Sequence, residues 1–317
     1  MLDYLTQEEK YQFRKANDGK AWLGFLTTWA MIIASMALVA ICPNVFTVLV
    51  ALLVIGGRQL ALGILLHDCS HRSWFSSQKL NDRVGHWLAG IPVLVPMSFY
   101  RPYHFTHHTK TGTDDDPDVG NIRDYPISKQ RFKRKLFRDL TGQSGVKSLL
   151  AMLLYVNTGR VGNARAMGQQ KKALTREQIL RTTLINYRDL IVFHGSAFTL
   201  LWVLGQPYLY LLWWGAYLIP FQTISRIRQI AEHGAMPELS SDDVRMTTRT
   251  TLARWWERML FAPHFVNYHC EHHFMPTVPG YHLKQLHEMV RERGFYQEHP
   301  HALAGNYREV VRRATQG

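Results

Sequence analysis

The sequence predicts an all-α membrane protein: four transmembrane helices in two hairpins, under a cytosolic helical cap that holds a histidine-rich metal site. Two long uncharged stretches support this prediction, because residues 21–57 and 190–225 contain no Asp, Glu, Lys or Arg. A proline interrupts each stretch near its middle and favours a turn between two apolar helices. The third observation is that eight of the 16 histidines fall in three windows of five residues.

The first predicted hairpin covers residues 21–66. It follows a polar N-terminal segment, residues 1–20, which we expect to lie in the cytosol and to begin a capped helix at Thr6. Residues 21–42 are long enough to cross the hydrocarbon core, which takes about 20 residues. Arg58 is the one charged residue of the hairpin. We expect it either to snorkel or pair near the inner third of its span, or to serve the substrate or metal site.

Residues 67–189 are predicted to form the first part of the cap. Residues 84–97 are apolar but short and contain two prolines, so they favour an interfacial or re-entrant segment over a span. The basic run at residues 131–135 predicts either a solvated face or contact with anionic head groups.

The second predicted hairpin covers residues 190–228, with spans at 190–206 and 208–225 that are separated by Gly205-Gln-Pro207. Residues 229–317 complete the cap and include an amphipathic helix around residues 283–290. The whole chain, residues 1–317, is therefore predicted to be a single domain with its metal-binding residues on the cytosolic side.

Three histidine boxes carry the predicted metal site. Histidines spaced three or four residues apart lie on one face of a helix, one turn apart. Eight imidazoles exceed the four ligands of one zinc ion, but they match two metal ions with positions left for water or oxygen. Imidazole suits iron, copper, zinc and nickel, so the ligand type leaves the metal open. The boxes are His67 and His71; His104, His107 and His108; and His269, His272 and His273.

Further residues near the boxes are candidates for supporting roles. His233 follows the second hairpin as His67 follows the first, so the predicted topology places it beside the boxes. Gln229 lies one turn before it and could hold a metal-bound water. Carboxylates beside ligating imidazoles commonly orient them, although each acid could equally be a solvated surface charge or part of a capped turn. The remaining candidates are Asp68, Asp116, Glu232, Asn267 and Glu271.

The composition narrows the class of protein and its location. The net charge is +13, and nothing in the sequence resembles a nucleic-acid-binding module. Basic cytoplasmic loops of a membrane protein explain the excess, and a basic face could dock an acidic electron carrier. The three cysteines show no pairing pattern. We expect an integral, multi-pass protein with its site on the cytoplasmic side of a bacterial inner membrane, and no cleavable signal peptide.

The order and spacing of the three boxes, with apolar hairpins between them, resemble the membrane fatty acid desaturase superfamily. This superfamily includes membrane hydroxylases and carotenoid ketolases. The resemblance covers roughly residues 21–279. The short first box is similar to that of acyl-lipid desaturases, and the third box is followed by Pro276 as in the family. Residues 112–118 are also similar to carotenoid ketolases.

The resemblance implies a di-iron enzyme that takes O2 as co-substrate and inserts a double bond into a fatty acyl or related lipid chain. No His-Pro-Gly-Gly motif of a fused haem domain is present, so electrons are expected from a separate protein, such as a ferredoxin with its reductase. A hydroxylase or ketolase on the same scaffold is the alternative. A membrane haem or metal carrier fits less well, because the histidines follow the predicted spans. The implied iron ligands are His67, His71, His104, His107, His108, His233, His269, His272 and His273.

Overall fold

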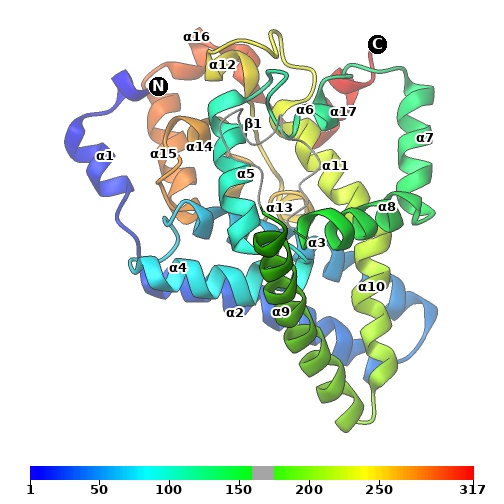
Figure 1. Ribbon diagram of the computed structural model, residues 1–317. Coiled ribbons are helices and arrows are strands. Elements are labelled where there is room, and N and C mark those ends of the chain that lie inside the picture. Colours follow the sequence, from blue (N-terminus) through cyan, green and yellow to red (C-terminus); the bar gives the residue numbers. More distant parts are fainter. Residues whose placement is uncertain (159–174) are drawn as a thin grey trace.

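The computed structural model describes residues 1–158 and 175–317. Helices make up nearly all the regular structure of this part of the chain (Figure 1). Two short strands, β1 (Thr250–Thr251) and β2 (Leu303–Ala304), pair in parallel. The all-α fold class predicted from the sequence is therefore confirmed.

The first predicted hairpin is formed by α2 (Asp18–Ile41) and α3 (Val45–Ser70). The helices have 24 and 26 residues, which gives about 36 and 39 Å at 1.5 Å per residue, enough to cross a bilayer core. The Asn17 and Asn44 side chains cap them by accepting hydrogen bonds from backbone N–H groups of the first turn. Within the described residues, α2 and α3 are the two helices long and apolar enough to span a membrane.

The second hairpin differs from its predicted form. It consists of α9 (Arg176–Val203), η5 (Pro207–Leu209), α10 (Tyr210–Leu218) and α11 (Pro220–His233). The first half of α9 is charged, and α10 has only nine residues, about 14 Å of helix. The chain breaks before Pro220, because proline lacks an N–H donor and clashes with the preceding turn. The span expected at residues 208–225 is thus divided between two helices, and the four-span arrangement stays a prediction.

Helix α3 is the centre of the fold. It packs against α2, α10, α11 and α5, and its buried Leu62 and Leu65 share a core with Phe25 of α2 and Trp213 of α10. Arg58 of α3 is buried, and its guanidinium donates to the backbone carbonyl of Met259. Arg58, which we expected either to snorkel or pair within the span or to serve the substrate or metal site, is therefore paired with a backbone carbonyl.

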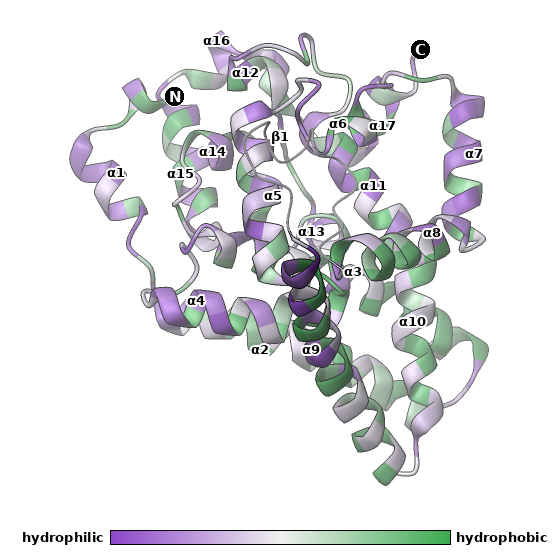
Figure 2. Cartoon of the chain, viewed as in Figure 1, coloured by the Kyte–Doolittle hydropathy of each residue, from purple (hydrophilic) through white to green (hydrophobic). Residues whose placement is uncertain are grey.

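The remaining elements form the cap, which lies above the converging ends of α9 and α10 in Figure 1. In Figure 2 hydrophobic residues prevail in the lower half of α9 and in α10, whereas hydrophilic residues are frequent in the cap. These elements are η1 (Leu2–Tyr4), α1 (Gln7–Phe13), α4 (Gln78–Val84), η2 (Gly85–Gly90), η3 (Ile91–Val93), α5 (Met97–Lys110), α6 (Val119–Ile122), α7 (Lys129–Leu140), α8 (Gln143–Ala151), η4 (Met152–Val156), α12 (Val244–Thr247), α13 (Trp255–Leu260), η6 (Pro263–Phe265), α14 (His269–Phe274), α15 (Gly280–Glu292), α16 (Phe295–Glu298), η7 (Pro300–Ala302) and α17 (Tyr307–Ala314).

Three local predictions can be compared with the cap. Thr6 caps α1 through reciprocal hydrogen bonds with Glu9, as its sequence predicted. The apolar segment at residues 84–97 forms the short π-helix η2 and the 3₁₀-helix η3 and no spanning helix. The predicted amphipathic helix around residues 283–290 is α15, which buries Leu283, Leu286 and Val290.

Candidate metal centre

The nine histidines predicted as ligands converge at one place, although they come from four separate parts of the chain. Their ring nitrogens form two groups, and within each group these atoms lie within 4.8 Å of one another. The first group contains His67, His71, His104, His108 and His272. The second group contains His107, His233, His269 and His273.

Helical geometry explains how the boxes divide between the groups. On α5, His104 and His108 are four residues apart and face the first group, whereas His107 faces the second. On α14, His272 faces the first group, and His269 and His273 face the second. Because both helices serve both groups, the two groups are neighbours.

The ring nitrogens within each group are in close contact. In the first group, the Nε2 atom of His104 lies 2.9 Å from that of His71 and 2.9 Å from that of His108. In the second group, the Nε2 atoms of His269 and His233 are 2.8 Å apart. Nitrogen atoms that converge in this way are arranged as the ligands of a shared cation would be.

Three of the imidazole rings donate a hydrogen bond from Nδ1–H to an oxygen acceptor outside the two groups. The Nδ1–H of His67 donates to Asp68 Oδ1 at 2.6 Å, and that of His107 donates to Asp116 Oδ1 at 2.8 Å. The Nδ1–H of His233 donates to the carbonyl of Thr247 at 2.9 Å. Metal-ligating histidines characteristically donate their second nitrogen to such an acceptor, which fixes the ring and directs Nε2 towards the metal.

The donor set fits metal ions. The Nε2 atoms of His67 and His273 are buried without a hydrogen-bond partner among the described residues, an arrangement that is unfavourable unless something else binds them. Burial holds the pKa of His269 and His272 well below the ordinary histidine value, and neighbouring imidazoles lower it further. The rings of His269 and His272 are therefore neutral at pH 7, as metal ligands must be.

His107 behaves differently from the other buried rings. Burial disfavours its charged form, but the hydrogen bond to Asp116 and the nearby carboxylates outweigh burial, and the pKa of His107 is raised. The acidic turn after the second box thus reaches back to one of its imidazoles.

The other predicted supporting residues lie at varying distances from the histidines. Glu232 Oε1 lies 3.6 Å from the Nδ1 atom of His269 and accepts from the guanidinium of Arg228 at 2.7 Å. Burial raises the pKa of Glu232 to about 7, although Arg228 opposes this. Gln229 lies one helical turn before His233, and its side chain lines a cavity next to the histidine groups.

Glu271 and Asn267 contact residues outside the two groups. Glu271 accepts hydrogen bonds from His287 Nδ1 (2.6 Å), Tyr296 Oη (2.5 Å) and the Thr250 hydroxyl. Asn267 donates to the carbonyl of Thr251. Both side chains therefore tie the third box to β1 and, in the case of Glu271, to α15 and α16.

Two residues that contact this centre were not predicted from the sequence. Tyr100 stacks on His104, with ring centroids 5.3 Å apart and an interplanar angle of 12°. Arg228 pairs with Glu232. Each lies four residues before its partner, so the i,i+4 spacing on a helix would have placed both on the correct face.

A cavity of about 760 Å³ lies next to the first histidine group. Tyr100 both lines this cavity and stacks on His104, so the cavity adjoins the cluster. Much of its wall is apolar, with Leu60, Ile64 and Leu66 contributed by α3. A volume of this size is typical of sites for small-molecule ligands.

Comparison with known proteins identifies the family. A family model described as fatty acid desaturase matches residues 43–304, which include all nine histidines. The chain belongs to the fatty acid desaturase family. This desaturase is accordingly an oxidoreductase, and the family predicted from the histidine boxes is confirmed.

Several curated desaturases are similar over most of the chain. The dihydrorhizobitoxine desaturase of Bradyrhizobium elkanii is 25% identical over 256 residues, which cover 78% of this chain and 69% of that protein. An sn-1 oleoyl-lipid 12-desaturase of Synechocystis sp. is 26% identical, covering 71% of this chain and 63% of its own length. An sn-1 acyl-lipid omega-3 desaturase (ferredoxin) of Synechocystis sp. is 24% identical, covering 73% and 64%. The chain thus spans about two thirds of the length of these relatives.

Proposed function

We propose that this chain is an O2-dependent di-iron desaturase that inserts a double bond into a fatty acyl chain of a lipid. The observation that carries the proposal is the pair of histidine groups, five and four imidazoles, beside a cavity whose α3 wall is apolar. The five-histidine group would hold one iron and the four-histidine group the other. When bound, the irons would supply the activation of O2 that the oxidation of an unactivated C–H bond requires.

The chain's own residues would orient the ligands and position the substrate. Asp68 and Asp116 fix the rings of His67 and His107, and the backbone N–H of Gly280 holds Asp68 in place through a 3.1 Å hydrogen bond. The apolar wall of the cavity would exclude water and hold an alkyl chain in one register. The carbon held nearest the histidine groups would then be the one that is oxidised, which would set the position of the double bond.

The relatives support a lipid substrate and a separate electron donor. The names of two relatives refer to acyl lipids, and one of these names includes ferredoxin. We therefore infer an acyl-lipid substrate and a ferredoxin-like donor with its reductase. We also propose four membrane crossings with the cap in the cytoplasm of a bacterium, for which α2 and α3 give the first two crossings.

The proposal is tested by expressing the chain in a bacterium together with a ferredoxin and its reductase. Lipids are profiled by mass spectrometry and compared with those of a strain expressing His272→Ala, which lacks one imidazole of the first group. A product two mass units lighter, absent from the variant strain, supports the desaturase. A product sixteen units heavier would reassign the chain as a hydroxylase, and full activity of His272→Ala would contradict the ligand assignment.

A further inference from the structure

Helix α8 has two different faces. Its inner face lines the cavity through Ser144, Lys147, Ser148 and Ala151. Gly145 allows this close packing, because a Cβ atom there would overlap the carbonyl of Leu218 at the end of α10. The position of α8 against α10 thus defines one wall of the cavity.

The outer face of α8 is apolar and exposed. Val146, Leu150 and, in the following η4, Leu154 are spaced four residues apart and are 49%, 49% and 53% exposed. Phe137 and Leu140, at the adjoining end of α7, are exposed as well. An apolar stripe flanked by basic residues is typical of a helix that lies in the membrane–water interface.

Two exposed basic residues line the open end of the cavity, and the one acid among its lining residues, Asp118, accepts a 2.8 Å hydrogen bond from the Tyr103 hydroxyl. Arg138 of α7 and Lys147 of α8 line the cavity and are exposed, whereas Leu66 and Gln59 in the same wall are buried. In the part of the chain that the structure describes, neither basic side chain forms an ion pair. Arg226 also lines the cavity, but Asp139 neutralises it through a 2.6 Å ion pair.

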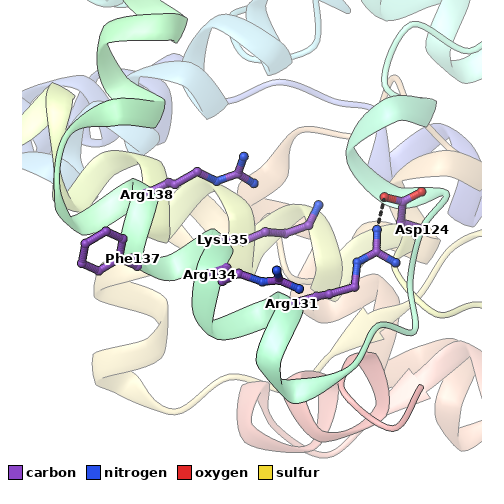
Figure 3. A pocket seen from close by; sticks show the side chains of 6 residues that line it. All are labelled: Asp124, Arg131, Arg134, Lys135, Phe137 and Arg138. Atoms are coloured by element: carbon purple, nitrogen blue, oxygen red, sulfur yellow. Dashed lines mark ion pairs between the residues drawn. The ribbon is translucent and has the colours of Figure 1, made fainter.

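Helix α7 extends this positive charge away from the cavity. Figure 3 shows Arg131, Arg134, Lys135 and Arg138 along one side of α7, with Asp124 facing the far end of the row. Asp124 lies 3.6 Å from Arg131 and is the one acid in this group of lining residues. The end of the row that borders the cavity, at Arg138, is therefore electropositive.

We propose that Arg138 and Lys147 bind the negatively charged head group of a membrane phospholipid whose acyl chain occupies the cavity. The inference rests on the proposed function, because it takes the cavity to be the site of the acyl chain. A phosphate-bearing head group could also come from a soluble acyl-coenzyme A. The apolar stripe of α8 favours the membrane, since it places the open end of the cavity at the level of the lipid head groups.

The test measures lipid binding to the purified protein without electrons or O2. Native mass spectrometry in detergent gives the relative affinities for dioleoyl phosphatidylglycerol, dioleoyl phosphatidylcholine and oleoyl-coenzyme A. The double variant Arg138→Glu/Lys147→Glu is compared with Arg291→Glu/Arg308→Glu, which makes the same change of charge at exposed positions of α15 and α17. A charge-neutral pair, Arg138→Gln/Lys147→Gln, serves if the first variant fails to fold.

We expect the native chain and the α15/α17 variant to bind phosphatidylglycerol roughly tenfold more tightly than phosphatidylcholine, and the Arg138/Lys147 variants to lose this preference. Equal affinity for the two lipids, an unchanged preference in the variants, or tighter binding of oleoyl-coenzyme A would overturn the inference. Because binding is measured without turnover, these outcomes leave the desaturase proposal standing. The desaturase proposal is tested separately, with the metal-loaded protein and its electron donor. If the lipid binds as expected but is never converted, the desaturase proposal is wrong.

Discussion

Gly63 offers the sharpest test of whether the cavity holds the substrate. It lies in α3 and lines the cavity, and a Cβ atom added there would meet no heavy atom within 4 Å outside its own helix. A substitution by alanine would therefore add a methyl group to the cavity without disturbing the packing around it. The protein should fold and bind metal normally while its substrate fits less well.

The size of the effect follows from the chemistry of the site. One methylene too many in a hydrophobic pocket changes specificity by about 1–3 kcal/mol, or roughly 10- to 200-fold in kcat/KM. We expect Gly63→Ala to lower kcat/KM for an 18-carbon acyl lipid within this range, and to affect a shorter chain less. Gly63→Leu should remove activity on the longer chain.

The matched control is Gly195→Ala in α9. Gly195 also has no neighbour within 4 Å of an added Cβ, but it does not line the cavity. Products from acyl lipids of several lengths would be quantified by mass spectrometry, with iron content measured on the same preparations. If Gly63→Leu desaturates long chains as well as the native protein does, the acyl chain lies elsewhere and the assignment of the cavity is wrong.

Three further predictions concern the metal centre and the cap. His233→Ala should reduce the iron content of the purified protein, because it removes one of four imidazoles from the second group; elemental analysis showing unchanged iron would contradict this. Asp116→Asn should weaken metal binding roughly 10- to 100-fold in a chelator competition, since the His107 ring loses its carboxylate acceptor; undiminished affinity would argue against an orienting role. Asp139→Asn should destabilise the fold by about 3 kcal/mol, because it leaves the half-buried Arg226 without its carboxylate; an unchanged thermal midpoint would refute the pairing.

The convergence of the histidines within each box could be predicted, because it depends only on residues that are close in the sequence. Residues three or four positions apart on a helix point in the same direction whatever surrounds them, so the spacing of His104, His107 and His108 by itself predicted that their side chains converge. His233 was located by topology alone, from its position after an apolar hairpin. In the structure, a ring nitrogen of His233 lies within 4.8 Å of ring nitrogens of three box histidines.

The second hairpin shows where local reasoning falls short. Hydropathy indicated two spans at residues 190–206 and 208–225, but it could not show that α9 extends back to Arg176 or that the chain breaks before Pro220. That break lies against α3, where a Cβ atom at Gly56 would be 3.1 Å from Pro220 Cγ. A contact between residues more than 160 positions apart has no local signature.

The sequence by itself determined the family, the helical class and the eight imidazoles of the three boxes, because each depends on residue identity and short-range spacing. Only the tertiary structure decided how the nine histidines divide into groups of five and four, which acids reach them, and that Glu271 faces α15 and α16. The same holds for the cavity between α3, α8 and α11, whose wall is assembled from distant segments. The physical reason is that ligand type and helical phase are properties of neighbouring residues, whereas grouping and enclosure depend on how separate helices pack.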